Sequence, residues 1–176
     1  MRSVLREVLR QDRPFPSLEA EVFVALQVAA NRALDPWARF LRQEAGLTPN
    51  QYNVLRILRG ARPAGLTCGQ ITERMITRDP DVTRLTDRLV RNGHAQRVRA
   101  EGDRRVVEVS ITQAGLDLLA RLDRNTAAEL LGGLGDARLG ALRDLLADVI
   151  VAVSNRTLAA SAPSPRKHTP ARGAAS

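Results

Sequence analysis

Apolar side chains recur every three or four residues along most of this chain, the spacing that places them on one face of an α-helix. The pattern predicts six helices, at residues 17–46, 48–60, 67–75, 80–92, 113–131 and 137–154. After the fourth helix, residues 95–99 and 106–112 read as β-strands, and the second of them alternates apolar and polar side chains. The link between them contains Gly102 and is short enough for a hairpin. The sequence therefore predicts a mainly α-helical fold with one small β-hairpin.

Capping residues indicate where several of these helices begin. Segments 48–51 and 67–70 each place a threonine three residues before a glutamine, which is the capping-box pattern. Asp79, which precedes a proline, is expected to cap the fourth helix, and Thr112 is expected to cap the fifth. Pro36 is expected to kink or break the first helix, because proline removes a hydrogen bond and clashes with the preceding turn.

Composition gives the chain a basic character. It has 27 Lys and Arg against 19 Asp and Glu, for a formal net charge of +8, which favours an anionic partner. All but one of the basic residues are arginine, a bias that genome composition alone can produce. The location of the charge is more informative, because residues 78–105 hold eight arginines and five acidic residues.

The sequence also argues against several classes of protein. We find no apolar run of about 18 residues and no signal-peptide pattern, and the single cysteine, Cys68, fits a reducing cytoplasm. Two histidines, His94 and His168, are too few for a typical zinc site, and neither a phosphate-binding glycine loop nor a nucleophile elbow is present. We therefore expect a cytoplasmic protein with no enzyme activity, metal or cofactor.

Cys68 is the one candidate for a redox switch, and His94 is a candidate for ligand or metal binding. Cys68 lies near the beginning of the third predicted helix, a position that can activate a thiol, but a small packed residue is the favoured interpretation. His94 follows the fourth predicted helix, where a contact at the helix end is favoured over metal or ligand binding.

Arginines recur on one face of the fourth predicted helix, at Arg84, Arg88 and Arg91. The apolar stripe that faces inward is separate from them and comprises Val82, Leu85 and Leu89. One interpretation is a solvated face whose arginines pair with acids such as Asp81 and Asp87. The short helix before it and the hairpin after it favour another, in which the helix lies in a DNA major groove.

Individual roles follow from this second interpretation. Thr83 and Arg84 are expected to approach base edges, since arginine is the commonest reader of guanine. Arg78 and Arg88 are expected to neutralise phosphates. The hairpin adds Arg97, Arg99, Arg104 and Arg105, and a protruding arginine can enter the narrow minor groove. The alternative is a plain hairpin turn in which glycine and Asp103 serve only the conformation.

Residues 47–124 resemble the MarR family of winged helix-turn-helix repressors. The resemblance is carried, in this order, by LTPNQYNVLRIL, DVTRLTDRLVRNGHAQRV, GDRRVVEVSIT and TQAGLDLL. It implies a homodimer that binds a pseudo-palindromic operator in double-stranded DNA. It also places the Asp-x-Arg wing motif of the family on Asp103 and Arg105. There the aspartate holds arginines by a salt bridge, and Arg105, or alternatively Arg104, enters the minor groove.

The predicted organisation has four parts. They are a flexible basic arm at 1–16, a helical dimerisation region at 17–46 and 113–155, a winged helix-turn-helix DNA-binding domain at 47–112, and a disordered basic tail at 156–176. The terminal helices carry more apolar surface than a small winged domain can cover, and packing two copies would bury it. An ordinary intramolecular bundle is the alternative.

The resemblance further implies that an aromatic or phenolic effector releases the DNA by binding between the dimerisation helices and the winged domain. Trp37, Phe40 and Tyr52 flank that crevice, although such residues are more often simply part of a core. We therefore expect a dimeric, sequence-specific transcription regulator that acts as a ligand-responsive repressor. The alternative is a winged-helix interaction module that binds nucleic acid without sequence choice, or a protein partner.

Overall fold

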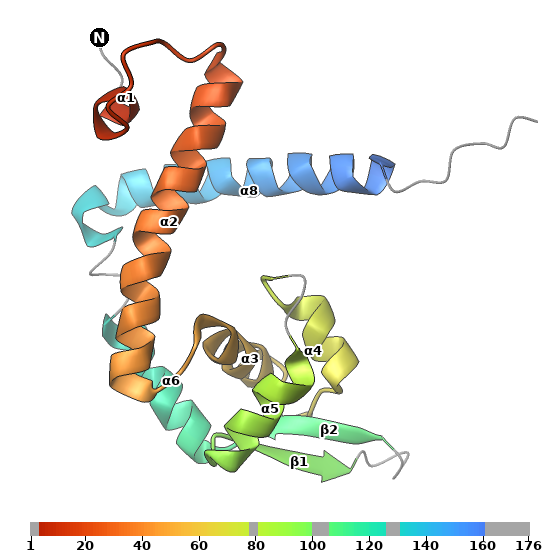
Figure 1. The fold of residues 1–176 in the computed structure, drawn as a ribbon. Helices are drawn as coiled ribbons and strands as arrows, with labels where there is room; N and C mark the ends of the chain where they lie inside the picture. Colours follow the sequence, from red (N-terminus) through yellow and green to blue (C-terminus); the bar gives the residue numbers. More distant parts are fainter. Residues whose placement is uncertain (1–3, 78–80, 100–105, 126–130, 161–176) are drawn as a thin grey trace, which may run out of the picture. The chain divides into compact units, whose positions relative to one another are not determined.

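The computed structural model describes residues 4–77, 81–99, 106–125 and 131–160, and the chain divides into two compact units, Met1–Leu130 and Leu131–Ser176 (Figure 1). The first unit contains α1 (Val4–Val8), α2 (Leu18–Ala45), α3 (Pro49–Gly60), α4 (Cys68–Arg74), α5 (Val82–Arg91), β1 (Ala95–Arg99), β2 (Val107–Ile111) and α6 (Gln113–Asn125). The second contains the 3-10 turn η1 (Gly132–Leu134) and α8 (Asp136–Ala160). The predicted fold class, mainly helical with one hairpin, is confirmed. None of the helices among the described residues is long and apolar enough to cross a membrane.

The predicted caps at the beginning of α3, α4 and α6 are confirmed. At α3, the Gln51 N–H donates to Thr48 Oγ1 at 3.3 Å and the Thr48 N–H donates to Gln51 Oε1 at 2.9 Å. Thr67 and Gln70 form the same reciprocal pair at α4. At α6, Thr112 Oγ1 accepts the N–H of Gly115 at 3.1 Å. Each cap satisfies backbone groups that the first turn of a helix leaves without partners.

Three features of the helices differ from those predicted. The helix α2 continues through Pro36, so the proline does not break it; a helix of 28 residues tolerates the loss of one hydrogen bond. The cap of α5 is Asp81, whose carboxylate accepts the Arg84 N–H at 3.1 Å; Asp79 lies outside the described residues. The last helix, α8, reaches Ala160 and so includes residues 156–160, which the sequence had indicated to be disordered.

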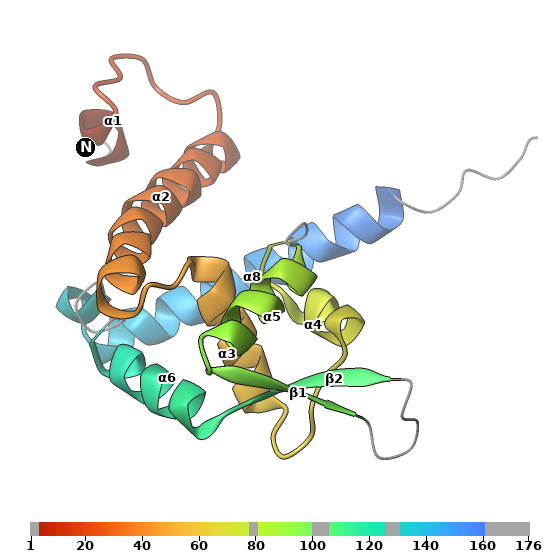
Figure 2. The ribbon, with the colours of Figure 1, turned by 60° about the horizontal axis from the view of Figure 1, so that its bottom comes forward.

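The hydrophobic core lies where α3 packs against α4, α5, α6 and the hairpin, with the last turns of α2 beside it (Figure 2). Its fully buried apolar side chains are Leu41, Leu47, Val54, Leu55, Leu58, Ile71, Leu89, Val109 and Leu119. The rest of α2 contributes little to this core. Its apolar side chains from Leu18 to Leu34 are largely exposed, and Phe23 is 61% exposed.

The two strands pair antiparallel, from Ala95 opposite Ile111 to Arg99 opposite Val107. A third segment joins them, because Leu66 exchanges two backbone hydrogen bonds with Val109, of 3.0 and 2.8 Å. The sequence predicted only a loop there. The bridge attaches the connection between α3 and α4 to β2. We call the hairpin of β1 and β2 the wing.

Candidate nucleic-acid interface

The helix α5 presents a polar, cationic face to solvent. Thr83, Arg84, Arg88 and Arg91 are all exposed, whereas Val82 and Leu89 are buried in the core. Helical spacing alone places the three arginines on one side, as the sequence predicted. The first turn, with Thr83 and Arg84, is the part of a recognition helix that contacts base edges.

The inward face of α5 differs from the prediction in two residues. Leu85 is only partly buried and lines the surface, while Thr86 is fully buried. The Thr86 hydroxyl lies 2.9 Å from the carbonyl oxygens of both Val82 and Thr83, so its donor is satisfied by the helix itself. A hydroxyl bonded in this way can be buried without an unpaired polar group. The Thr86 hydroxyl oxygen also lies 3.9 Å from Cys68 Sγ of α4.

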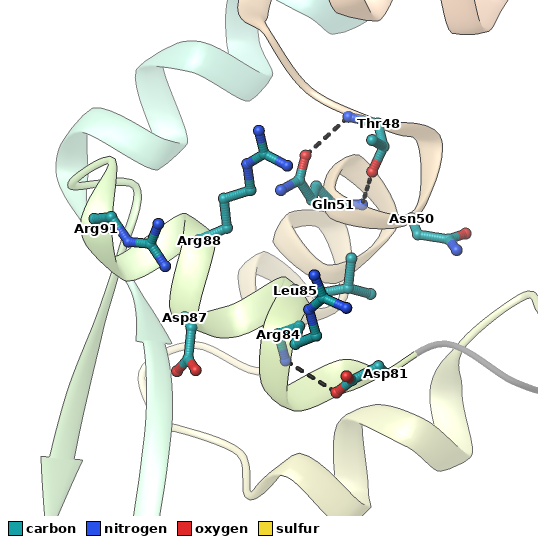
Figure 3. A pocket seen from close by; sticks show the side chains of 9 residues that line it. All are labelled: Thr48, Asn50, Gln51, Asp81, Arg84, Leu85, Asp87, Arg88 and Arg91. Carbon is teal, nitrogen blue, oxygen red and sulfur yellow. Dashed lines mark hydrogen bonds between the residues drawn. The ribbon is translucent and has the colours of Figure 1, made fainter.

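A polar groove of about 500 Å³ separates α5 from the beginning of α3 (Figure 3). Its lining comprises Thr48, Asn50, Gln51, Asp81, Arg84, Leu85, Asp87, Arg88 and Arg91. Three arginines therefore lie opposite the N-terminus of a 12-residue helix. Both the cations and the positive end of the helix dipole favour a negatively charged partner, such as a phosphate backbone.

Among the described residues, no acid neutralises the arginines of this groove. Across the described ranges 4–77, 81–99, 106–125 and 131–160, no ion pair involves Arg84, Arg88 or Arg91. The two acids that could have paired with them have other partners, since Asp81 caps α5 and Asp87 pairs with Arg97 of β1. These contacts argue against a self-neutralised surface and leave the cationic face available.

Of the wing, the structure describes residues 95–99 and 106–111. Arg97 is bridged to Asp87, which ties β1 to α5, and Arg99 is exposed. The other predicted contacts of this region, Arg78, Asp103, Arg104 and Arg105, lie outside the described residues.

The three candidate effector residues form one aromatic cluster. The Trp37 ring stacks on Phe40 at 5.8 Å between centroids and meets Tyr52 edge-on at 4.9 Å. Trp37 and Phe40 are half-buried and Tyr52 is buried. Phe40 also borders a cavity of about 230 Å³ whose other lining residues are Glu44, Arg121, Leu122 and Arg124.

Sequence reasoning missed the polar partner of this cluster. The Tyr52 hydroxyl donates to Asp123 Oδ1 at 2.7 Å, and Arg59 Nη1 lies 2.5 Å from the other carboxylate oxygen. Burial, and then the hydrogen bond to Asp123, raise the pKa of Tyr52 to about 12. Burial alone would raise the pKa of Asp123, but the hydrogen bonds from Arg59 and Tyr52 outweigh it and lower that pKa. At neutral pH, Tyr52 is therefore an un-ionised phenol that is hydrogen-bonded to the ionised carboxylate of Asp123.

Cys68 and His94 are both partly buried within the fold. Cys68 is half-buried at the beginning of α4, against Thr86 of α5. The backbone N–H of His94 donates to Leu89 O at 2.9 Å at the end of α5, and the buried imidazole Nδ1 has no hydrogen-bond partner among the described residues, so the predicted side-chain contact at the helix end stays a prediction. Burial, and then the charge of Arg121, lower the pKa of His94, so the imidazole is neutral at physiological pH. No group of three or more potential metal ligands occurs among the described residues.

Known proteins share both the sequence pattern and the fold. A family model described as MarR family matches residues 45–106. The HTH-type transcriptional regulator TtmR of Methylorubrum extorquens is 30% identical, over 82% of this chain and 71% of TtmR. A MarR transcription factor from Planctomyces limnophilus, known from its crystal structure, has 37% sequence identity to this chain. The match covers 76% of this chain and 98% of that one, with a TM-score of 0.55. A MarR family regulator from Streptomyces coelicolor, in complex with DNA, is 22% identical and covers 79% of this chain and 91% of that one, with a TM-score of 0.65.

The matches extend well beyond the wing and its neighbouring helices. TtmR and the Planctomyces protein each align with more than two thirds of their own length, at 30% identity or higher. The three relatives named above are described as regulators of transcription or as a transcription factor, which agrees with the expectation that the chain is a regulator and not an enzyme. The chain belongs to the MarR family of winged helix-turn-helix transcriptional regulators.

Proposed function

We propose that two copies of this chain bind a pseudo-palindromic operator and repress the adjacent genes. In each copy, α5 lies in the major groove with Thr83 and Arg84 at the base edges, while Arg88 contacts a phosphate. Arg78 contributes a second phosphate contact. The wing enters the minor groove through Arg105 or Arg104, held by Asp103.

One observation carries this proposal. The exposed face of α5 gathers Thr83, Arg84 and Arg88 beside the capped beginning of α3, with no acidic partner for these arginines among the described residues. An exposed arginine without an acidic partner can bind a DNA phosphate and release the counterions condensed there, whereas an arginine paired with an acid must first give up that partner. The Streptomyces coelicolor relative was crystallised in complex with DNA, which supports DNA as the partner of this chain as well.

The test compares the two arginines whose proposed roles differ. Arg84→Ala should cost about 1–3 kcal/mol of specific binding and relax the choice of sequence, because it removes a contact to a base. Arg88→Ala should weaken binding to all duplexes alike and lower the salt slope by about one unit, because it removes a contact to phosphate. Fluorescence anisotropy on duplexes from upstream of the chain's own gene, with scrambled duplexes beside them, measures both effects.

This experiment also separates the proposal from its alternative. A winged-helix module without sequence choice would bind the upstream and scrambled duplexes equally. A specific regulator should prefer its site by at least about a thousandfold. If Arg84→Ala leaves both affinity and preference unchanged, Arg84 is not a base-reading residue.

Exposed apolar side chains support the homodimer. In the second unit, α8 leaves Leu145, Ile150 and Val151 more than half exposed, and an open apolar groove of about 420 Å³ runs along it. In the first unit, Leu18, Val22 and Phe23 of α2 are similarly exposed. Apolar patches of this kind are rarely left in water. Sedimentation velocity should therefore give twice the monomer mass for the free chain and two chains per duplex; a monomer at micromolar concentration would contradict the proposal.

The aromatic cluster and its neighbouring cavity support a ligand response. Phe40 and Leu122 provide apolar walls, and the two cations Arg121 and Arg124 outnumber the single carboxylate, Glu44, so the net charge of this cavity favours an aromatic acid. Trp37 is the only tryptophan in the chain and stacks on Phe40. Titration with benzoate or a phenolic acid should therefore change tryptophan fluorescence and release the DNA at the same concentrations. Arg121→Ala should weaken both effects together; fluorescence changes without DNA release would contradict a regulatory role.

A further inference from the structure

The turn that leaves α4 is held by two asparagines of α3. The Ile76 N–H donates to Asn53 Oδ1 at 3.1 Å, and Thr77 Oγ1 donates to Asn50 Oδ1 at 3.3 Å. Asn50 and Asn53 are three residues apart, so their side chains lie on the same face of α3. Two consecutive residues of the turn are thus bound to one face of one helix.

These contacts occur where the turn has little other support. The helix α4 ends at Met75, which is extended, so the next N–H has no acceptor inside the helix. Ile76 is 81% exposed and Thr77 is also exposed, so Met75 alone of residues 75–77 packs against the core. Among the residues that the structure describes, no other hydrogen bond joins residues 75–77 to a distant segment.

The helix that carries the asparagines is a rigid support. Val54, Leu55 and Leu58 are at most 1% exposed, so α3 is fixed within the core. On the far side of the turn, α5 begins with its own cap and presents Thr83 and Arg84 in its first turn. The attachment of Ile76 and Thr77 to α3 therefore restrains the chain a few residues before Thr83 and Arg84, in addition to the burial of Val82 in the core.

We propose that Asn53 and Asn50 are positioning residues for sequence recognition, which set the placement of the first turn of α5 without contacting a base. This inference rests on the proposed function, since it assigns a specificity role to residues of the same site. Base hydrogen bonds depend steeply on geometry, whereas phosphate attraction acts over longer distances. The loss of a positioning residue should therefore lower specific binding more than nonspecific binding.

The experiment measures a selectivity ratio for the full chain. This ratio is the affinity for the upstream duplex that the wild type binds most tightly, divided by the affinity for a scrambled duplex. Asn53→Ala should lower this ratio roughly tenfold, with unchanged scrambled-duplex affinity and salt slope. Asn53→Asp should restore most of it, because a carboxylate oxygen still accepts the Ile76 N–H and its charge affects both duplexes alike. Asn31→Ala is the matched control, because its amide only bonds to Gln27 O within α2.

The outcomes are distinguishable. If the wild-type chain does not discriminate between the duplexes, the proposed function fails and this inference fails with it. If the wild type discriminates but Asn53→Ala keeps the same ratio, or loses affinity for both duplexes equally, only the positioning role is overturned. Should Asn53→Ala not fold, Thr77→Val removes the hydroxyl that Asn50 accepts and should lower the ratio in the same way; an unchanged ratio in that variant would overturn the inference.

Discussion

Gly115→Ala should destabilise the chain by about 3 kcal/mol or more, although alanine is the better helix former by about 1 kcal/mol. A Cβ at this position would lie 2.2 Å from the backbone oxygen of His94 and 2.8 Å from Ile111 Cγ1. The backbone cannot yield there, because the His94 oxygen also accepts the Thr112 N–H at 3.1 Å and Thr112 Oγ1 donates to the Gly93 oxygen at 2.7 Å. The glycine is therefore required by the close packing of α6 against the segment that joins α5 to β1.

Thermal and urea unfolding of the variant measure this effect. The matched control is Gly69→Ala in α4, where the nearest atom to a new Cβ is Thr67 Oγ1 at 3.9 Å. That control should change stability by no more than about 1 kcal/mol, in the stabilising direction. Because the same junction positions the wing relative to α5, Gly115→Ala should also weaken DNA binding at temperatures where it stays folded. Equal stability for the two variants would show that the junction adapts and that the close approach is not needed.

The sequence predicted the features that depend on neighbouring residues. The capping boxes of α3 and α4 were predictable because each joins residues three positions apart. The arginine face of α5 was predictable for the same reason, since helical spacing alone decides which side chains share a face. The apolar alternation of β2 likewise indicated one apolar face, of which Val109 and Ile111 are buried in the core and Val107 is 49% exposed.

The sequence could not predict contacts that the fold creates between distant segments. Tyr52 and Asp123 are 71 residues apart, and no periodicity indicates that one side chain will accept a hydrogen bond from the other. The bridge between Leu66 and Val109 depends on where the hairpin lies relative to a loop. Thr86 was missed for a different reason, because a polar residue type conceals that its hydroxyl is satisfied by the helix backbone.

Tyr52 should ionise with a midpoint near pH 12, about two units above an ordinary tyrosine, because it is buried and bound to an ionised aspartate. It is the only tyrosine in the chain, so the absorbance of tyrosinate reports this residue alone. A group whose pKa is higher in the folded state stabilises the fold fully below its unfolded pKa, near 10, and loses that contribution as the pH rises towards 12. Between about pH 10 and pH 12, the free energy of unfolding should therefore fall more for the wild type than for Tyr52→Phe, which cannot ionise at this position. The difference between the two falls should be at most about 2–3 kcal/mol.

Removing the carboxylate should have the complementary effect at neutral pH. Asp123→Ala leaves the Tyr52 hydroxyl and the Arg59 guanidinium without this partner, and should cost about 2 kcal/mol. It should also move the tyrosinate midpoint towards 10, because the second cause of the shift is gone. Asp117→Ala is the matched control, since this aspartate of α6 accepts an exposed hydrogen bond from Gln113 within its own helix. The ionised form of Asp123 stabilises the fold above its unfolded pKa and loses this effect as acid protonates the folded state, so Asp123→Ala and the wild type should converge in stability at low pH. A tyrosinate midpoint that stays near 12 in Asp123→Ala would show that burial alone sets it and that the carboxylate is not its partner in solution.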